Sequence, residues 1–157
     1  MVGGRERLQR SPTSSVHVGP MNTILLVDDS RVSREVIKIF LIGRQVRVLE
    51  ASDGREALEL LLDKTPDLIL ADLEMPELDG VGLCEALYAD ARLRRIPVLV
   101  LSGTATPEQT RRCRAAGALE VLSKPIQPQA LLAALDRHLA PSAATPARPA
   151  QGPTLRA

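Results

Sequence analysis

Five short aliphatic runs, each followed by a segment of helical periodicity, constrain the fold of this chain more than any other feature. Most positions in these runs are apolar. Strands covered on both faces have this pattern, whereas strands with one face in water alternate apolar and polar residues. The runs are TILLV (23–27), VRVLE (46–50), LILA (68–71), PVLVL (97–101) and ALEVL (118–122).

The segments between the runs carry apolar residues three or four positions apart, which predicts amphipathic helices. One helix is predicted to begin at a capping box of Asp53 and Glu56, and another, over about 106–116, at Thr106, with Pro107 at its first position and Gln109 at its third. Five strand–helix units in succession predict right-handed crossovers and a doubly wound α/β sandwich with a parallel sheet. The predicted buried stripes are Val32, Val36, Ile37, Phe40 and Leu41; Ala57, Leu58, Leu61 and Leu62; Val81, Cys84, Leu87 and Tyr88; and Leu131, Leu132, Leu135 and Leu139.

The length of 157 residues suits one domain with two tails. Residues 21–140 are predicted to be the domain, and a hydrophobic content of 45% is enough for its core. Residues 1–20 are rich in Gly, Ser, Pro and Arg, and residues 141–157 are rich in Pro and Ala. Neither segment could bury much apolar surface, so both are predicted to be disordered.

Several classes of protein are disfavoured by composition. A formal net charge of +1 gives no electrostatic case for binding nucleic acid or a membrane surface. No apolar run approaches the roughly 18 residues of a membrane span, and the basic N-terminus lacks the apolar core of a secretory signal. A cytoplasmic protein is expected, with Cys84 and Cys113 as reduced core residues rather than a disulfide or a metal pair.

Polar residues follow four of the five predicted strands. Asp28 and Asp29 follow the first, Asp72 the third, Ser102 the fourth, and Lys124 comes shortly after the fifth. The carboxyl ends of parallel strands share one edge of the sheet, and ligands bind there. Taken singly, each residue also has a purely structural interpretation, as a helix cap, a turn residue or a solvated charge.

Taken together, these residues favour a phosphoryl-transfer site. Three carboxylates at one edge repel each other unless a cation compensates them, and oxygen ligands of this kind suit Mg²⁺. Lys124 would add a compact positive charge and Ser102 a hydroxyl donor. Asp72 would then be the nucleophile that forms an aspartyl phosphate.

Four segments resemble, in the same order, those of the receiver domains of two-component response regulators. These segments are ILLVDDSRVSR, LILADLEMPELDG, PVLVLSG and VLSKPI, and the resemblance extends over about residues 22–140. It implies a CheY-like, flavodoxin-like fold with strand order 2-1-3-4-5. It also implies bacterial-type phosphorelay signalling.

The resemblance assigns roles position by position. Asp72 matches the phosphoacceptor, while Ser102 and Lys124 match the residues that contact the phosphoryl oxygens. A commonly cis peptide bond is implied between Lys124 and Pro125. The implied Mg²⁺ ligands are Asp28, Asp29, Asp72 and the backbone carbonyl of Glu74.

The chain departs from the family pattern in two places. Val121 stands where the family often has a Tyr or Phe that turns inward on phosphorylation, and a stiff β-branched side chain has no ring to move. Glu74 stands at a position that tunes the dephosphorylation rate in the family, so Glu74 and Thr104 are expected to set the lifetime of the aspartyl phosphate.

The fourth predicted helix, TPEQTRRCRAA, contains no Leu, Ile, Val, Met or aromatic residue. Its packing is therefore predicted to be weak. With Arg111, Arg112 and Arg114 it is predicted to be a moving output surface, although an ordinary solvated basic face remains an alternative.

The function expected from these features is that of a stand-alone receiver. A histidine kinase or phosphotransfer protein would phosphorylate Asp72, and the helix 4–strand 5–helix 5 face would bind a downstream protein. The chain is expected to assist its own phosphoryl transfer rather than to act as an enzyme on other substrates. Two alternatives stay open: a docking receiver that is not phosphorylated, and a haloacid-dehalogenase-type phosphohydrolase, which would need a second Asp at the position of Glu74 and a cap domain.

Overall fold

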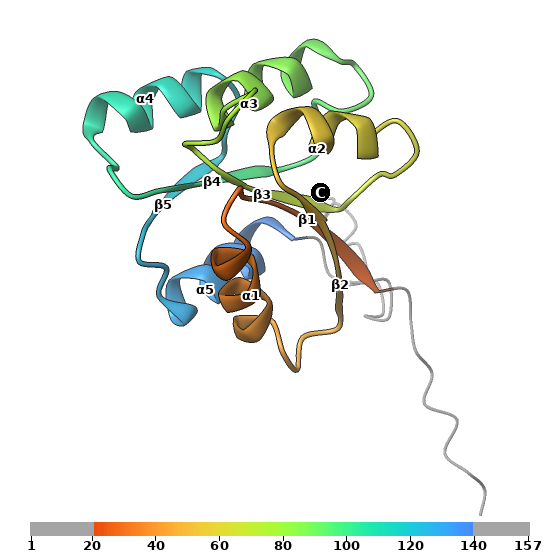
Figure 1. Ribbon diagram of the computed structural model, residues 1–157, viewed down its shortest axis with the longest axis vertical. Coiled ribbons are helices and arrows are strands. Elements are labelled where there is room, and N and C mark those ends of the chain that lie inside the picture. Colours follow the sequence, from red (N-terminus) through yellow and green to blue (C-terminus); the bar gives the residue numbers. More distant parts are fainter. Residues whose placement is uncertain (1–20, 140–157) are drawn as a thin grey trace, which may run out of the picture.

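The computed structural model describes residues 21–139, which form a five-stranded parallel sheet between two layers of helices (Figure 1). The strand order β2-β1-β3-β4-β5 confirms the predicted doubly wound, flavodoxin-like topology. The predicted tails, 1–20 and 141–157, lie outside the described residues. The strands are β1 (Asn22–Val27), β2 (Val46–Ala51), β3 (Leu68–Asp72), β4 (Val98–Ser102) and β5 (Glu120–Ser123).

The five helices divide between the two faces of the sheet. Helices α1 (Arg31–Phe40) and α5 (Pro128–His138) cover one face. Helices α2 (Gly54–Leu60), α3 (Gly80–Ala89) and α4 (Pro107–Ala115) cover the other (Figure 1). Among the described residues, no helix is long and apolar enough to cross a membrane.

Successive residues of the strands point into two separate cores. On β3, Ile69 and Ala71 face the α2–α3–α4 layer, whereas Leu68 and Leu70 face the α1–α5 layer, and all four are fully buried. This two-sided burial explains why the run LILA is continuously apolar. It also gives the end of β3, where Asp72 lies, a rigid support on both sides.

The predicted helix caps are confirmed in part. Thr106 and Gln109 form the predicted capping box at the start of α4. Asp53 accepts a hydrogen bond from the backbone N–H of Glu56, but the Glu56 carboxylate accepts from the backbone and hydroxyl of Ser52 instead of completing the box. Glu56 therefore links the end of β2 to the start of α2.

Four residues of the predicted buried stripes are exposed. Val32 is 73% exposed, and Val36 also faces solvent, because each is rotated about the helix axis from the buried line of Ile37 and Leu41. Leu62 and Tyr88 were also predicted to be buried and are also exposed. Leu62 lies beyond the end of α2, and Tyr88 is one position past the buried Leu87.

Candidate functional site

The structure brings the acidic residues predicted at the ends of β1 and β3 to one place. Asp28, Asp29 and Asp72 each offer a carboxylate oxygen, and these oxygens lie within 4.8 Å of one another. Asp28 and Asp72 are buried, whereas Asp29 is exposed. This convergence follows from the parallel sheet, in which β1 and β3 are neighbours in register.

Asp28 is held from several directions. Its backbone N–H donates to the carbonyl of Ala51 in β2 at 3.1 Å. Its Oδ1 accepts a hydrogen bond from the backbone N–H of Ser30 at 2.8 Å, which turns the chain after β1. Its Oδ2 lies 3.2 Å from Nζ of Lys124. The carboxylate of Asp28 therefore has a fixed direction.

Asp72 shares the same ammonium group. Nζ of Lys124 lies 3.2 Å from Oδ1 of Asp72, and the backbone N–H of Glu74 lies 3.4 Å from that oxygen. Burial raises the pKa of Asp72, the nearby charge of Asp28 raises it further, and Lys124 offsets only part of the increase. Burial alone would lower the pKa of Lys124, but the charges of Asp72 and Asp28 outweigh it and raise that pKa.

Asp29 differs from its two neighbours because its carboxylate has no hydrogen bond or ion pair to any of residues 21–139. One ammonium pairs with two of the three carboxylates, so the cluster carries surplus negative charge. Hard oxygen donors with surplus negative charge fit a hydrated divalent cation such as Mg²⁺. The donor set therefore agrees with the predicted metal site.

Ser102 lies at the end of β4 and is almost fully buried. Its hydroxyl oxygen accepts a hydrogen bond from the backbone N–H of Thr104 at 3.2 Å, and an oxygen that accepts in this way can still donate its own hydrogen. The backbone N–H of Lys124 donates to the Ser102 carbonyl at 2.8 Å. This bond ties the end of β5 to the end of β4, and the Lys124–Pro125 peptide that follows is cis, as predicted.

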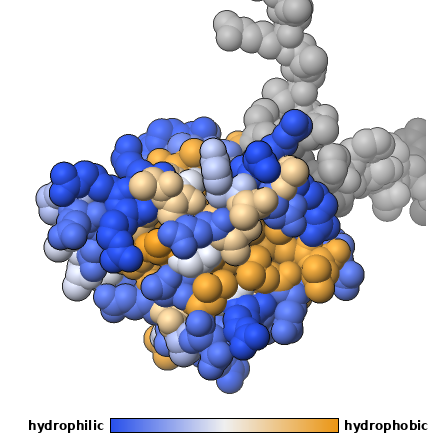
Figure 2. Space-filling model, turned by 90° about the horizontal axis from the view of Figure 1, so that it is seen from above, coloured by the Kyte–Doolittle hydropathy of each residue, from blue (hydrophilic) through white to orange (hydrophobic). Residues whose placement is uncertain are grey.

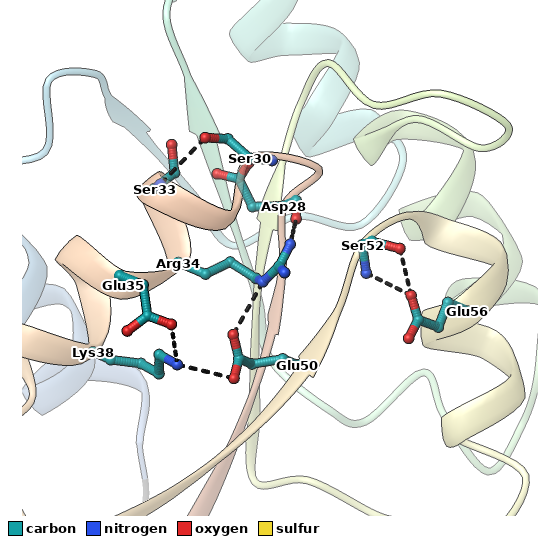
Figure 3. Close-up of polar contacts among 9 residues, drawn as sticks. All are labelled: Asp28, Ser30, Ser33, Arg34, Glu35, Lys38, Glu50, Ser52 and Glu56. Carbon is teal, nitrogen blue, oxygen red and sulfur yellow. Dashed lines mark hydrogen bonds and ion pairs between the residues drawn. The ribbon is translucent and has the colours of Figure 1, made fainter.

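Two residues that contact the site were not predicted as part of it. Gln109 was predicted only as a capping residue, yet its Oε1 lies 3.1 Å from the hydroxyl of Thr104, which in turn lies 3.4 Å from a carboxylate oxygen of Glu74. Arg34 donates a hydrogen bond to the backbone carbonyl of Asp28 (Figure 3). Thr104 and Gln109 are five residues apart and Asp28 and Arg34 are six, but helical periodicity and capping patterns do not identify a contact between a strand-end loop and the helix that follows it.

Val121 lies in β5 and packs against the core under α2, α3 and α4. Its partial burial agrees with its interpretation as an ordinary strand residue. Among the described residues the only aromatic side chains are Phe40 in α1 and Tyr88 in α3. An inward-turning ring at the β5 position is therefore excluded by the sequence itself.

Comparisons with known proteins agree with this geometry. The family model of the response regulator receiver domain matches residues 24–136. A two-component response regulator of Oryza sativa is 39% identical over 110 residues, which cover 69% of this chain and 84% of that protein. A gliding motility regulatory protein of Myxococcus xanthus is 38% identical over 134 residues, covering 83% of this chain but 17% of the longer protein.

Solved structures give the same result. The chemotaxis protein CheY4 of Vibrio cholerae is 33% identical, with a TM-score of 0.72 over 76% of this chain and 100% of that one. The receiver domain of a sensor histidine kinase of Pseudomonas aeruginosa is 31% identical, with a TM-score of 0.70 over 76% of this chain and 98% of that one, and has a magnesium ion coordinated in its active-site cleft. The chain described above belongs to the response regulator receiver family of two-component signalling.

Proposed function

We propose that this receiver accepts a phosphoryl group on Asp72, with Mg²⁺ bound, from a phosphohistidine of a sensor kinase or phosphotransfer protein. The observation that carries the proposal is the convergence of three carboxylate oxygens within 4.8 Å, beside an ammonium that lies 3.2 Å from both Asp28 and Asp72. A site of purely structural charges would not need to bring three carboxylates together with one lysine that pairs with only two of them.

In the proposed transfer, a carboxylate oxygen of Asp72 forms a bond to phosphorus while the bond from phosphorus to the donor imidazole nitrogen breaks. The electron pair of the broken bond stays on the imidazole. Lys124 and the hydroxyl of Ser102 hold phosphoryl oxygens. Bound Mg²⁺, held by Asp28, Asp29, Asp72 and the backbone carbonyl of Glu74, would supply positive charge that offsets the charge of the carboxylates and the phosphoryl group.

Hydrolysis of the aspartyl phosphate would end the signal, with attack by water and release of inorganic phosphate. In this proposal the chain assists reactions at its own carboxylate and is not an enzyme that acts on a separate substrate. The charges of Asp72 and Asp28 raise the pKa of Lys124, so its ammonium is charged at neutral pH before a metal or a phosphoryl group arrives.

The phosphodonor would approach over α1 and the segment after β5. There an apolar groove lies beside Lys124 and is lined by Val32, Val36, Phe40, Pro125 and Ile126. The exposure of Val32 and Val36, which contradicted the predicted stripe, is consistent with a surface that a partner covers. A partner helix with an apolar face suits this groove, and it would bring a phosphohistidine toward Asp72.

The signal would leave through the α4–β5–α5 face. Within α4 only Cys113 is fully buried, and the face that α2, α3 and α4 form is strongly hydrophilic at the end where α4 lies (Figure 2). A helix with so little buried apolar surface can shift at low cost. Hydrogen exchange over residues 104–118, with and without a beryllium fluoride mimic of the phosphoryl group, should differ; identical protection would argue against α4 as the moving surface.

Acetyl phosphate with Mg²⁺ tests the phosphorylation directly. We expect a phosphoryl adduct on the wild-type chain by mass spectrometry, and none on Asp72→Asn or in the presence of EDTA. A folded wild-type chain that forms no adduct with either acetyl phosphate or beryllium fluoride would instead support a receiver used only for docking.

A further inference from the structure

We propose that Arg34 is a positioning residue for the metal site and that it acts through the backbone of Asp28. Arg34 lies in the second turn of α1, and its side chain is only 16% exposed. Its Nη1 donates to the backbone carbonyl of Asp28 at 2.5 Å, and its Nε donates to Oε1 of Glu50 at 3.0 Å (Figure 3). The inference rests on the proposed Mg²⁺ site and gives a role to Arg34, the last residue of the segment ILLVDDSRVSR, to which the family resemblance assigned none.

The hydrogen bond from Arg34 fixes a rigid unit. The carbonyl of Asp28 belongs to the planar peptide that ends at the Cα of Asp29, so its direction sets where the Asp29 side chain leaves the backbone. The preceding peptide is held as well, because the N–H of Asp28 donates to Ala51. Arg34 and Ala51 therefore fix the backbone on both sides of the Asp28 Cα.

Asp29 depends on this arrangement more than Asp28 does. The carboxylate of Asp28 is held by Ser30 and Lys124, whereas that of Asp29 has no partner within residues 21–139. Before a metal arrives, only the backbone and the rotamer preferences of the side chain therefore limit where the Asp29 carboxylate lies. Arg34 is the only described side chain that holds the carbonyl of this peptide.

Arg34 is itself held in place by an ion network between α1 and β2. Glu50 accepts from Arg34 through one oxygen and from Lys38 through the other, and Lys38 also bonds to Glu35 at 2.7 Å (Figure 3). A planar guanidinium can bridge a carbonyl and a carboxylate at the same time, which a lysine ammonium does with less directional control. The network thus connects the strand pairing of β1 and β2 to the geometry of the acidic pair.

Lys38 provides a matched control. It lies one helical turn from Arg34, carries the same charge and also pairs with Glu50, but it does not contact Asp28. Arg34→Met and Lys38→Met therefore remove the same charge, and only the first removes the bond to the Asp28 carbonyl. If long-range charge were the whole effect, either change would strengthen Mg²⁺ binding, because each removes a positive charge near a cation site.

The test is Mg²⁺ affinity measured by isothermal titration calorimetry on the full chain, with folding checked by circular dichroism. We expect Arg34→Met to weaken Mg²⁺ binding about tenfold, as loss of a residue that orients metal ligands commonly does, and Lys38→Met to change it less than about twofold. In phosphorylation by acetyl phosphate, the Mg²⁺ concentration for half-maximal rate should rise in Arg34→Met while the rate at saturating Mg²⁺ is kept.

Affinity in Arg34→Met equal to or tighter than that of Lys38→Met would overturn the inference. If Arg34→Met does not fold, Arg34→Lys takes its place: it keeps the charge and should still bind Mg²⁺ at least about threefold more weakly. An unchanged affinity in a folded Arg34→Lys would then refute the role. Failure of the wild-type chain to bind Mg²⁺ is a different result, which refutes the proposed function itself.

Discussion

Lys124 places its ammonium 3.2 Å from the carboxylate of Asp72, although its own chain segment lies two strands away in the sheet. The same ammonium lies 3.2 Å from Asp28, which is fully buried. The lysine therefore compensates two carboxylates before any metal or phosphoryl group is present. Its removal should affect the stability of the metal-free protein as well as its chemistry.

We expect Lys124→Met to lower the unfolding free energy in EDTA by about 1–3 kcal/mol, less than for a fully buried pair because Lys124 is partly exposed. Mg²⁺ should restore more stability to this variant than to the wild type, since the cation then neutralises charge that the lysine no longer offsets. Urea denaturation with EDTA and with Mg²⁺ measures both effects. Arg111→Met, on the exposed face of α4, is a control for loss of one positive charge; equal losses in the two variants would contradict the prediction.

A second prediction concerns Glu120 at the start of β5. Nη2 of Arg137 lies 2.6 Å and Nε2 of His138 lies 2.8 Å from its two carboxylate oxygens. Burial raises the pKa of Glu120, but the hydrogen bonds from Arg137 and His138 outweigh it and leave the pKa below its ordinary value of 4.5. A carboxylate with a lowered pKa stabilises the fold at pH values above its ordinary pKa. This contribution is lost as the pH falls through the lowered pKa.

Glu120→Gln should therefore melt at a lower temperature than the wild type at neutral pH, and the difference should shrink below pH 4.5. Thermal denaturation across this range gives the measurement. Glu59→Gln serves as the control, because Glu59 is exposed and has no ion pair within residues 21–139. If the difference in melting temperature between Glu120→Gln and the wild type does not change with pH, the charge of Glu120 is not the cause of its stabilising effect.

The fold was predictable because the apolar strand runs, the helical periodicity between them and the polar residues at the strand ends all indicate the same kind of fold. The continuous apolar run of β3 indicated burial on both faces, and Asp72 at its end indicated the edge where polar residues gather. The order of the strands came from the family resemblance. Spacing alone does not decide which strands lie next to each other.

Contacts that helix side chains make with the ends of the strands were not predictable in the same way. In the sequence, Arg34 is one of several charged residues on an amphipathic helix. Its hydrogen bond to the Asp28 carbonyl depends on how α1 packs beside the end of β1. The exposure of Val32 has the same origin, since periodicity identifies apolar residues but does not show which of two adjacent lines faces the sheet. These are properties of packing, which a single sequence encodes only through the whole fold.

A third prediction concerns the lifetime of the proposed aspartyl phosphate. The hydroxyl of Thr104 has a single hydrogen, and both Glu74 at 3.4 Å and Gln109 at 3.1 Å are acceptors for it. Glu74→Asn and Thr104→Ala both disrupt the contact between these side chains over the site. We expect each to change the decay rate of the adduct by about 2- to 10-fold, the effect of one hydrogen bond.

Because the two variants affect one contact, the double variant should change the rate by less than the product of the single changes. Decay of radiolabelled adduct, formed from a labelled low-molecular-weight phosphodonor, measures the rates. Thr65→Ala, at an exposed position before β3, controls for loss of a hydroxyl elsewhere. If the adduct decays at the wild-type rate in both single variants, Glu74 and Thr104 do not set its lifetime.

A fourth prediction concerns Gly80, the first residue of α3, which lies against the end of β3. A Cβ at this position would lie 2.6 Å from the backbone oxygen of Asp72 and 2.9 Å from the Cα of Leu73. Both neighbours are backbone atoms, so neither can yield without moving Asp72. Gly80→Ala should lower the unfolding free energy by about 2–4 kcal/mol, and the adduct yield on Asp72 should fall in the protein that remains folded.

Gly103 is the matched control, because it lies next to Ser102 at the same edge of the sheet and a Cβ there meets nothing within 4 Å. Gly103→Ala should change the unfolding free energy by no more than about 0.5 kcal/mol in urea denaturation. Equal stability of the two variants would mean that α3 can move away from β3 freely. The close approach of Gly80 to Asp72 would then have no part in holding the phosphoacceptor in place.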